Sequence, residues 1–138
     1  RALVTWAAVA SLHRWTQHQK ERWRSTGYLP LSREPSVGPL RLGIGLLNDL
    51  EEHRAEFDLR LAASRMRVPW LLVHGEADVT VPPKEARELY DAAPRASTQL
   101  DLLPAVGHLY NATTSTEDEY RTLNQLLVLT SHWLSLHL

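Results

Sequence analysis

The feature that most constrains the fold is a repeated order of short apolar runs and helical segments. Residues 3–10 (LVTWAAVA) and 70–73 (WLLV) are short runs of mostly apolar residues, typical of strands that are covered on both faces in a parallel sheet. Residues 98–103 (TQLDLL) are a third strand candidate. Because helical segments separate these runs, we expect an α/β fold of about three parallel strands with flanking helices.

The segments between the apolar runs predict one long insertion and several helices. Residues 26–42 are rich in Pro and Gly and are expected to form an irregular connection. Thr116 and Glu119 have the spacing of a capping box, which predicts the start of a long final helix. The other segments expected to be helical are residues 11–25, 46–54, 59–66 and 84–92.

The composition is that of a globular protein and gives no sign of a strongly charged binding partner. The chain has 138 residues, of which 43% are apolar and 22% charged, and this suits a single domain. The net charge of -1 gives no reason to expect nucleic acid or an acidic membrane as a partner. No apolar run is long enough for a membrane span, and no signal peptide is visible. The compartment stays open, with the cytoplasm slightly favoured.

The absence of cysteine narrows the possible chemistry. It excludes a thiolate nucleophile, a disulfide and a cysteine-based metal site within this chain. The seven histidines do not have the spacing of a metal-binding set. Gly43 and Gly45 begin a G-x-G pattern, but Asn48 stands where the third glycine of a dinucleotide fingerprint belongs. We therefore expect neither a metal nor an organic cofactor.

Two loops that follow expected strands each carry a titratable residue close to a glycine. Asp78 comes after the strand at 70–73, and His108 comes after the strand at 98–103. The two residues are 30 positions apart, which is the length of one strand-helix-strand unit. In an open α/β sheet, active sites form beyond the carboxyl ends of the strands. The two side chains are therefore expected to meet at one edge of the sheet.

A carboxylate beside an imidazole has a defined use in catalysis. The Asp78 carboxylate would fix the tautomer of the His108 ring, and His108 would act as a general base and then as a general acid. An aspartate alone in a loop is more often a turn residue, and a histidine after a glycine is a weak signal. Their joint placement after consecutive strands favours the catalytic interpretation.

These residues also carry a family resemblance. Residues 68–82 (VPWLLVHGEADVTVP) resemble the V-P-x-L-x-x-H-G-x-x-D-x-x-V-P segment around the triad acid of α/β hydrolases, closest to the dienelactone hydrolase and prolyl oligopeptidase-like branch. Residues 102–108 (LLPAVGH) are similar to the last strand and catalytic histidine of that family. The resemblance implies the C-terminal half of such a fold over residues 1–138. Residues 11–66 then correspond to a helical cap, and residues 67–138 carry the acid and the histidine.

The resemblance implies a serine hydrolase that cleaves an ester or amide bond. In the family the nucleophile comes first, in a G-x-S-x-G elbow, followed by the acid and the histidine. No serine here has that context. The motif needs glycine two residues before the serine, but Trp23 occupies that position for Ser25 and Glu34 for Ser36. The nucleophile and the oxyanion-hole donors are therefore expected upstream of Arg1. The chain would then be a piece of a longer protein and inactive alone.

Two alternatives stay open at this stage. The chain could be a non-catalytic α/β module, either a degenerate hydrolase or a binding domain, or the parent could use an aspartate nucleophile. The residues upstream of Arg1 would distinguish these possibilities. A separate expectation concerns the strand at 3–10, whose open edge and apolar faces predict self-association of the isolated chain.

Overall fold

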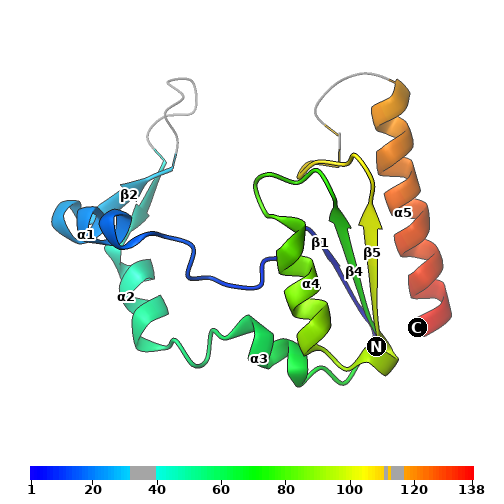
Figure 1. Ribbon diagram of the computed structural model, residues 1–138, viewed down its shortest axis with the longest axis horizontal. Coiled ribbons are helices and arrows are strands. Elements are labelled where there is room, and N and C mark those ends of the chain that lie inside the picture. The colour runs from blue at the N-terminus through cyan, green and yellow to red at the C-terminus, as the bar shows by residue number, and fades with distance from the viewer. Residues whose placement is uncertain (32–39, 111, 113–116) are drawn as a thin grey trace. The chain divides into compact units, whose positions relative to one another are not determined.

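The computed structural model describes residues 1–31, 40–110, 112 and 117–138 (Figure 1). The chain forms two compact units. The larger unit contains Arg1–Ser11 and Leu59–Leu138, and the smaller unit contains Leu12–Asp58. The capping box expected from Thr116 lies outside the described residues.

The larger unit is built on a three-stranded parallel sheet. Its elements in chain order are β1 (Leu3–Trp6), α3 (Leu59–Ser64), β4 (Trp70–Gly75), α4 (Pro83–Ala92), the 3-10 helix η1 (Arg95–Ser97), β5 (Thr98–Leu103) and α5 (Glu117–His137). The strand order is β1-β4-β5, and β4 pairs in parallel with both neighbours. The expected α/β class with parallel strands and flanking helices is confirmed.

The central strand β4 explains why the sheet has a helix layer on each face. Side chains alternate along a strand, so Trp70 and Leu72 lie on one face and Leu71 and Val73 on the other. The first pair packs with residues of α3 and α4, and the second pair packs with residues of α5. All six residues of β4 are buried. The apolar run predicted this for residues 70–73, and the strand continues through the polar His74 to Gly75.

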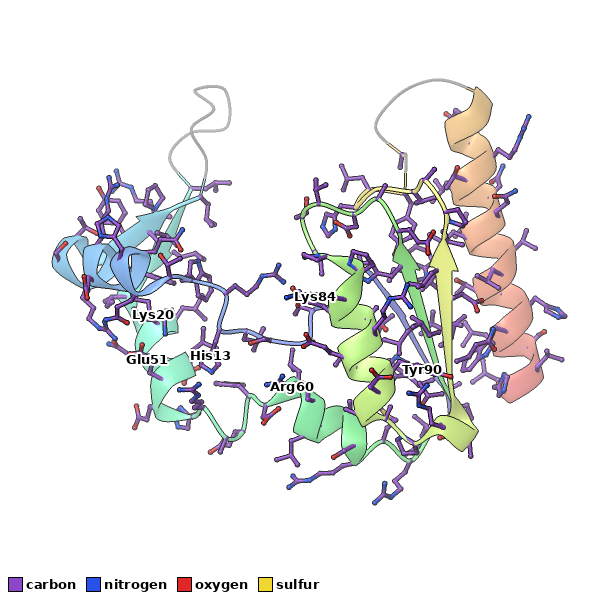
Figure 2. The ribbon with its side chains drawn as sticks, viewed as in Figure 1. His13, Lys20, Glu51, Arg60, Lys84 and Tyr90 are labelled. Carbon is purple, nitrogen blue, oxygen red and sulfur yellow. The ribbon has the colours of Figure 1, made fainter. Side chains whose placement is uncertain are left out.

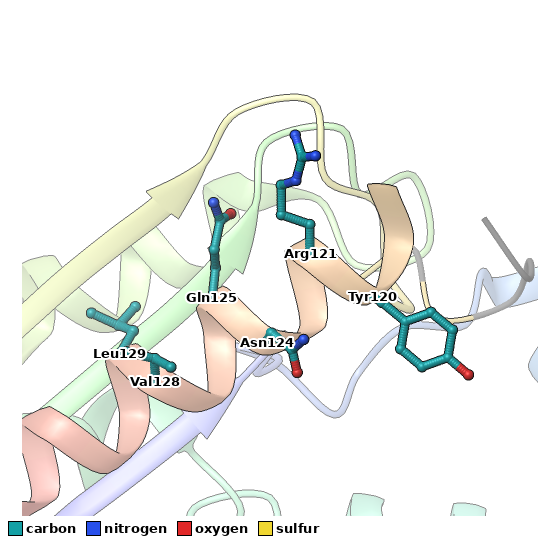
Figure 3. A pocket seen from close by; sticks show the side chains of 6 residues that line it. All are labelled: Tyr120, Arg121, Asn124, Gln125, Val128 and Leu129. Atoms are coloured by element: carbon teal, nitrogen blue, oxygen red, sulfur yellow. The ribbon is translucent and has the colours of Figure 1, made fainter. Parts of the chain in front are cut away.

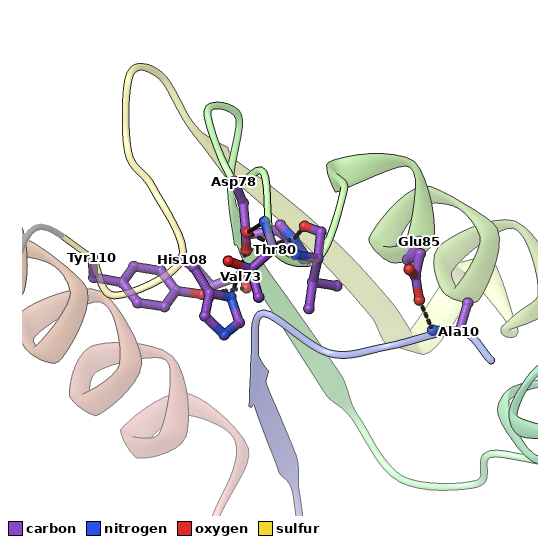
Figure 4. A network of polar contacts seen from close by, with 9 residues as sticks. Ala10, Val73, Asp78, Thr80, Glu85, His108 and Tyr110 are labelled. Atoms are coloured by element: carbon purple, nitrogen blue, oxygen red, sulfur yellow. Dashed lines mark hydrogen bonds and ion pairs between the residues drawn. The ribbon is translucent and has the colours of Figure 1, made fainter. Parts of the chain in front are cut away.

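The first strand is shorter than its apolar run suggested. A strand was expected over residues 3–10, but β1 ends at Trp6. The reason is Ala7, which has a left-handed φ of 49° and whose N–H still donates to the carbonyl of Val73 at 3.0 Å. Beyond it the chain turns into a loop, where the N–H of Ala10 donates to Glu85 Oε2 at 2.9 Å (Figure 4).

The smaller unit corrects two expectations. It contains α1 (Gln17–Thr26), β2 (Tyr28–Pro30), β3 (Arg41–Gly43) and α2 (Ile44–Glu52). The strands β2 and β3 pair in an antiparallel ladder where an irregular connection was predicted. The first helix begins at Gln17 rather than residue 11, because Thr16 caps it through a capping box with Gln19.

Aromatic packing and ion pairs hold the smaller unit together. Trp23 is fully buried, and its ring meets that of Trp15 edge-on at 5.1 Å between centroids. Lys20 and Arg24 of α1 contact the Glu51 carboxylate of α2 at 3.3 and 2.6 Å, and Figure 2 labels Lys20 and Glu51. Exposed ion pairs contribute little each, so the buried tryptophan is the main anchor. None of the helices in the described part of the chain has the length and apolar character to cross a membrane.

Candidate active site

The loop after β4 is organised around Asp78. Its Oδ1 atom accepts hydrogen bonds from the backbone N–H groups of Thr80 at 2.9 Å and Val81 at 2.8 Å. The Asp78 N–H donates to the carbonyl of Gly75 at 3.2 Å, which closes the turn that leaves the strand. The side chain is completely buried. Aspartate suits this loop because its short side chain can bond its own downstream backbone.

A second histidine supports the same carboxylate. His74 Nε2 lies 2.8 Å from the carbonyl oxygen of Val81 and 3.3 Å from Asp78 Oδ2. Both contacts are acceptors, so Nε2 must carry the ring proton and donate it. His74 Nδ1 is buried and has no hydrogen-bond partner among the described residues. The sequence did not predict the contact between His74 and the carboxylate, although the four-residue spacing to Asp78 permits it.

The loop after β5 folds back against the loop after β4. The chain turns at Ala105, which has a φ of 58°, and the N–H of Val106 donates to the carbonyl of Leu103 at 3.4 Å. The N–H groups of Glu76 and Ala77 donate to the carbonyls of Leu103 and Val106 at 2.9 and 3.0 Å. These backbone hydrogen bonds join the two loops independently of any functional side chain.

The structure brings Asp78 and His108 together. His108 Nδ1 donates to Asp78 Oδ2 at 2.9 Å, as Figure 4 shows. The Asp78 side chain has no exposed area, whereas the His108 side chain is 34% exposed. With Nδ1 as the donor, Nε2 holds a lone pair, and it makes no hydrogen bond to any residue that the structure describes. The proximity expected from the two strand ends is therefore observed.

The environment keeps the Asp78 carboxyl in its charged form. Burial raises its pKa, but hydrogen bonds from the Val81 N–H, the His108 ring and the Thr80 N–H outweigh that effect and hold the pKa below its ordinary value. The group is therefore a carboxylate at neutral pH. A charged carboxylate at Nδ1 fixes one tautomer of the ring and would stabilise the imidazolium form.

Tyr110 anchors the far end of the histidine loop. Its hydroxyl donates to the carbonyl of Val73 at 3.0 Å, and its ring lies 6.0 Å from that of Trp6. Burial raises the pKa of the Tyr110 phenol to about 12, and the nearby charge of Asp78 adds to this rise. The segment after His108 carries no motif that predicts this role. No local pattern signals that a tyrosine there returns to β4.

Backbone strain gathers at this edge of the sheet. Among the described residues, the non-glycine residues with positive φ are Ala7, Ala105 and Tyr110. Ala7 directly follows β1, and the other two lie in the loop after β5. Such conformations cost about 1–3 kcal/mol each and cluster at functional sites, because the surrounding structure must hold them. The location of the strain thus agrees with the location of the Asp78–His108 pair.

The other features of the described residues lie apart from this pair. A hollow on α5, drawn in Figure 3, involves no residue of the two loops; it is lined by Tyr120, Arg121, Asn124, Gln125, Val128 and Leu129. Over the part of the chain that the structure describes, no group of three or more metal-ligating side chains is found. The candidate active site is therefore the carboxyl edge of the sheet.

Comparisons with known proteins agree with this fold. The family model for serine aminopeptidase S33 matches residues 31–111. Among solved structures, the esterase domain of a Rhodothermus marinus protein is 23% identical and superposes with a TM-score of 0.54, over 92% of this chain and 49% of that one. A monoacylglycerol lipase from Paleococcus ferrophilus is 19% identical with a TM-score of 0.56, over 95% and 59%.

A third structure, mouse alpha/beta hydrolase domain-containing protein 10, is 18% identical with a TM-score of 0.61, over 96% of this chain and 52% of that one. No curated protein sequence matches the chain. The fold is that of an α/β hydrolase, and the chain spans about half the length of these structures. Because the family model covers more than half of the residues, the chain belongs to the serine aminopeptidase S33 family of α/β hydrolases.

Proposed function

We propose that this chain supplies the acid and the base of a Ser-His-Asp triad in a serine hydrolase. Asp78 is the acid, His108 is the base, and the nucleophilic serine lies upstream of Arg1 in a longer protein. The observation that supports this most strongly is the 2.9 Å hydrogen bond between a buried carboxylate and a partly exposed imidazole. A purely structural pair has no need for a partly exposed ring whose second nitrogen is left without a hydrogen bond to any described residue.

The proposed reaction uses each nitrogen of the His108 ring once. Nε2 takes the proton of the serine hydroxyl while the serine oxygen attacks the carbonyl carbon of the substrate. Asp78 Oδ2 accepts a hydrogen bond from the Nδ1–H group and stabilises the positive ring. The ring then gives its proton to the leaving alcohol or amine, which leaves an acyl-serine. Water, activated by the same nitrogen, releases the acid and restores the serine.

The substrate class follows from this chemistry and from family membership. A triad of this kind cleaves an ester or amide, and no metal or organic cofactor takes part in the steps described. An esterase domain and a monoacylglycerol lipase among the similar structures support the ester as the first substrate to test. We therefore propose a small carboxylic ester as the substrate, with a peptide or other amide as the second choice.

The direct test is the turnover of a chromogenic ester by the longer protein that contains this chain. Asp78→Asn and His108→Ala are each expected to lower kcat by about 10⁴-fold or more, as in other triads. The matched controls are Asp91→Asn on α4 and His132→Ala on α5, both at exposed positions outside the two loops. The controls should keep the wild-type rate.

Two outcomes would contradict the proposal. Near-normal turnover by Asp78→Asn or His108→Ala would remove that residue from catalysis. A coding region without a G-x-S-x-G elbow about 20 to 30 residues upstream of Arg1 would instead favour a non-catalytic module, or an aspartate nucleophile if that residue occupies the elbow.

The isolated chain is also proposed to associate with a second copy of itself. In the described residues no strand pairs with the outer edge of β1, where Trp6 is 39% exposed. Sedimentation velocity should show mass that rises with concentration. Val4→Pro should suppress it. The N–H groups of Leu3 and Ala7 donate to the carbonyls of Pro69 and Val73, so alternation turns the Val4 N–H to the open edge. A monomer at all concentrations would contradict this proposal.

A further inference from the structure

We propose that Gly75 is a positioning residue of the candidate active site: its lack of a side chain lets the histidine loop close over the end of β4 and bring His108 onto Asp78. The proposal rests on the proposed function and deepens it. Gly75 is the last residue of β4 and pairs with Leu103, the last residue of β5. It therefore stands where both loops begin.

The space above Gly75 is already filled by backbone. A Cβ atom at Gly75 would lie 2.7 Å from the carbonyl carbon of Val106, nearer still to its oxygen, and 3.0 Å from the carbonyl oxygen of Gly107. These atoms belong to the main chain, so they cannot rotate away as the end of a flexible side chain could. Gly75 is not in the left-handed region of φ, so the glycine is required for space rather than for backbone conformation.

The carbonyl that occupies this space also joins the two loops. The oxygen of Val106 accepts the N–H of Ala77, the neighbour of Asp78, at 3.0 Å. His108 lies only two residues beyond Val106. Any side chain at position 75 must therefore push the histidine loop outward. Because hydrogen bonds weaken steeply with distance, a displacement of about 1 Å is enough to break the contact between Asp78 and His108.

Gly107 offers a matched control in the same loop. Apart from its two chain neighbours, a Cβ at Gly107 would meet no atom within 4 Å, and its φ is not left-handed. Gly107→Ala therefore adds the same methyl group next to His108 without a clash. The two glycine variants differ in whether that methyl group meets the backbone of the facing loop.

The experiment uses the ring N–H proton of His108 in ¹⁵N-labelled protein. A hydrogen bond to a carboxylate shifts this proton far downfield in the NMR spectrum, and its loss in His108→Gln assigns the signal. The signal should be present in the wild type and in Gly107→Ala. It should be lost in Gly75→Ala, while the rest of the spectrum keeps the signal dispersion of a folded protein. A folded Gly75→Ala protein that keeps the signal would overturn the proposal.

A second measurement applies if Gly75→Ala does not fold. Scalar coupling across the hydrogen bond between the Ala77 nitrogen and the Val106 carbonyl carbon reports the closed loops in the wild type. Its presence would support the close approach, and its absence in the folded wild type would overturn the proposal.

Activity gives an independent readout that separates this proposal from the proposed function. In the longer protein, Gly75→Ala should lower kcat about 10²-fold with little change in KM, since it misplaces the base without touching the substrate. If His108→Ala keeps its activity, the triad is wrong even where the ring signal behaves as expected. If His108→Ala is inactive but Gly75→Ala keeps full activity and the ring signal, only the role of Gly75 is wrong.

Discussion

The loops after β4 and β5 hold their functional side chains in opposite ways. Asp78 is completely buried, and its two carboxylate oxygens receive bonds from two backbone N–H groups and contacts from two histidine rings. His108 is one-third exposed, and its hydrogen bond within the described residues is the one to Asp78. The acid is thus part of the protein interior, while the base is held at the surface by its loop and by one carboxylate. A triad base must meet a substrate, so this difference suits the proposed roles.

Deleting each side chain tests this contrast most strongly. Asp78→Ala leaves the N–H groups of Thr80 and Val81 without their acceptor, so we expect a loss of about 3 kcal/mol in the free energy of unfolding. His108→Ala should cost less than about 1 kcal/mol, because its ring is partly solvated. Urea unfolding at pH 7 measures both. Equal losses would show that the two loops do not differ as described.

Tyr110 tests whether the histidine loop has an internal anchor of its own. Tyr110→Phe removes the hydrogen bond to Val73 and should cost about 1 kcal/mol at pH 7. The folded pKa of this phenol is raised from 10.0 to about 12, so its contribution is fully present below pH 10 and lost as pH rises through 12. The wild type should therefore lose more stability than Tyr110→Phe between pH 10 and 12. Parallel pH curves would exclude this role.

The smallest change in stability is expected at Ala105, whose substitution tests the strain in the histidine loop. Ala105 has a φ of 58° and is the third residue of the turn from Leu103 to Val106, directly after a proline. Glycine is the usual residue at this position of such a turn. Ala105→Gly relieves about 1 kcal/mol or more of strain in the folded state. The greater entropy of glycine in the unfolded chain opposes folding by about half of that, so the variant should be stabilised by about 0.5 kcal/mol. Thermal unfolding measures the change. Destabilisation would mean that the turn does not carry this strain.

The sequence predicted the parallel strands and the meeting of Asp78 with His108, because both follow from local patterns. An apolar run reports burial, and a loop after a parallel strand has only one edge of the sheet to occupy. The contacts of His74 and Tyr110 could not be predicted in detail. The contact of His74 depends on how its own loop turns Val81 back toward the strand, and that of Tyr110 on a carbonyl of β4 that is distant in sequence. The same holds for Gly75, whose neighbour Val106 is distant in sequence.

Two errors have a different physical origin. The end of β1 depends on the left-handed turn at Ala7, and alanine gives no sequence signal for that conformation. The β2–β3 ladder was missed because Pro and Gly residues around it outweighed the short apolar segments in a reading by composition. The T-x-x-Q pattern at Thr16 could have placed the start of α1 correctly.

Labelling by a fluorophosphonate shows whether the Asp78–His108 pair activates a serine. The reagent reacts with a serine only when a base removes its proton. In the longer protein, the wild type should be labelled at a single serine within a G-x-S-x-G elbow, and His108→Ala should be labelled about 10³-fold more slowly or not at all. Labelling of His108→Ala at the wild-type rate would show that the pair does not activate the serine.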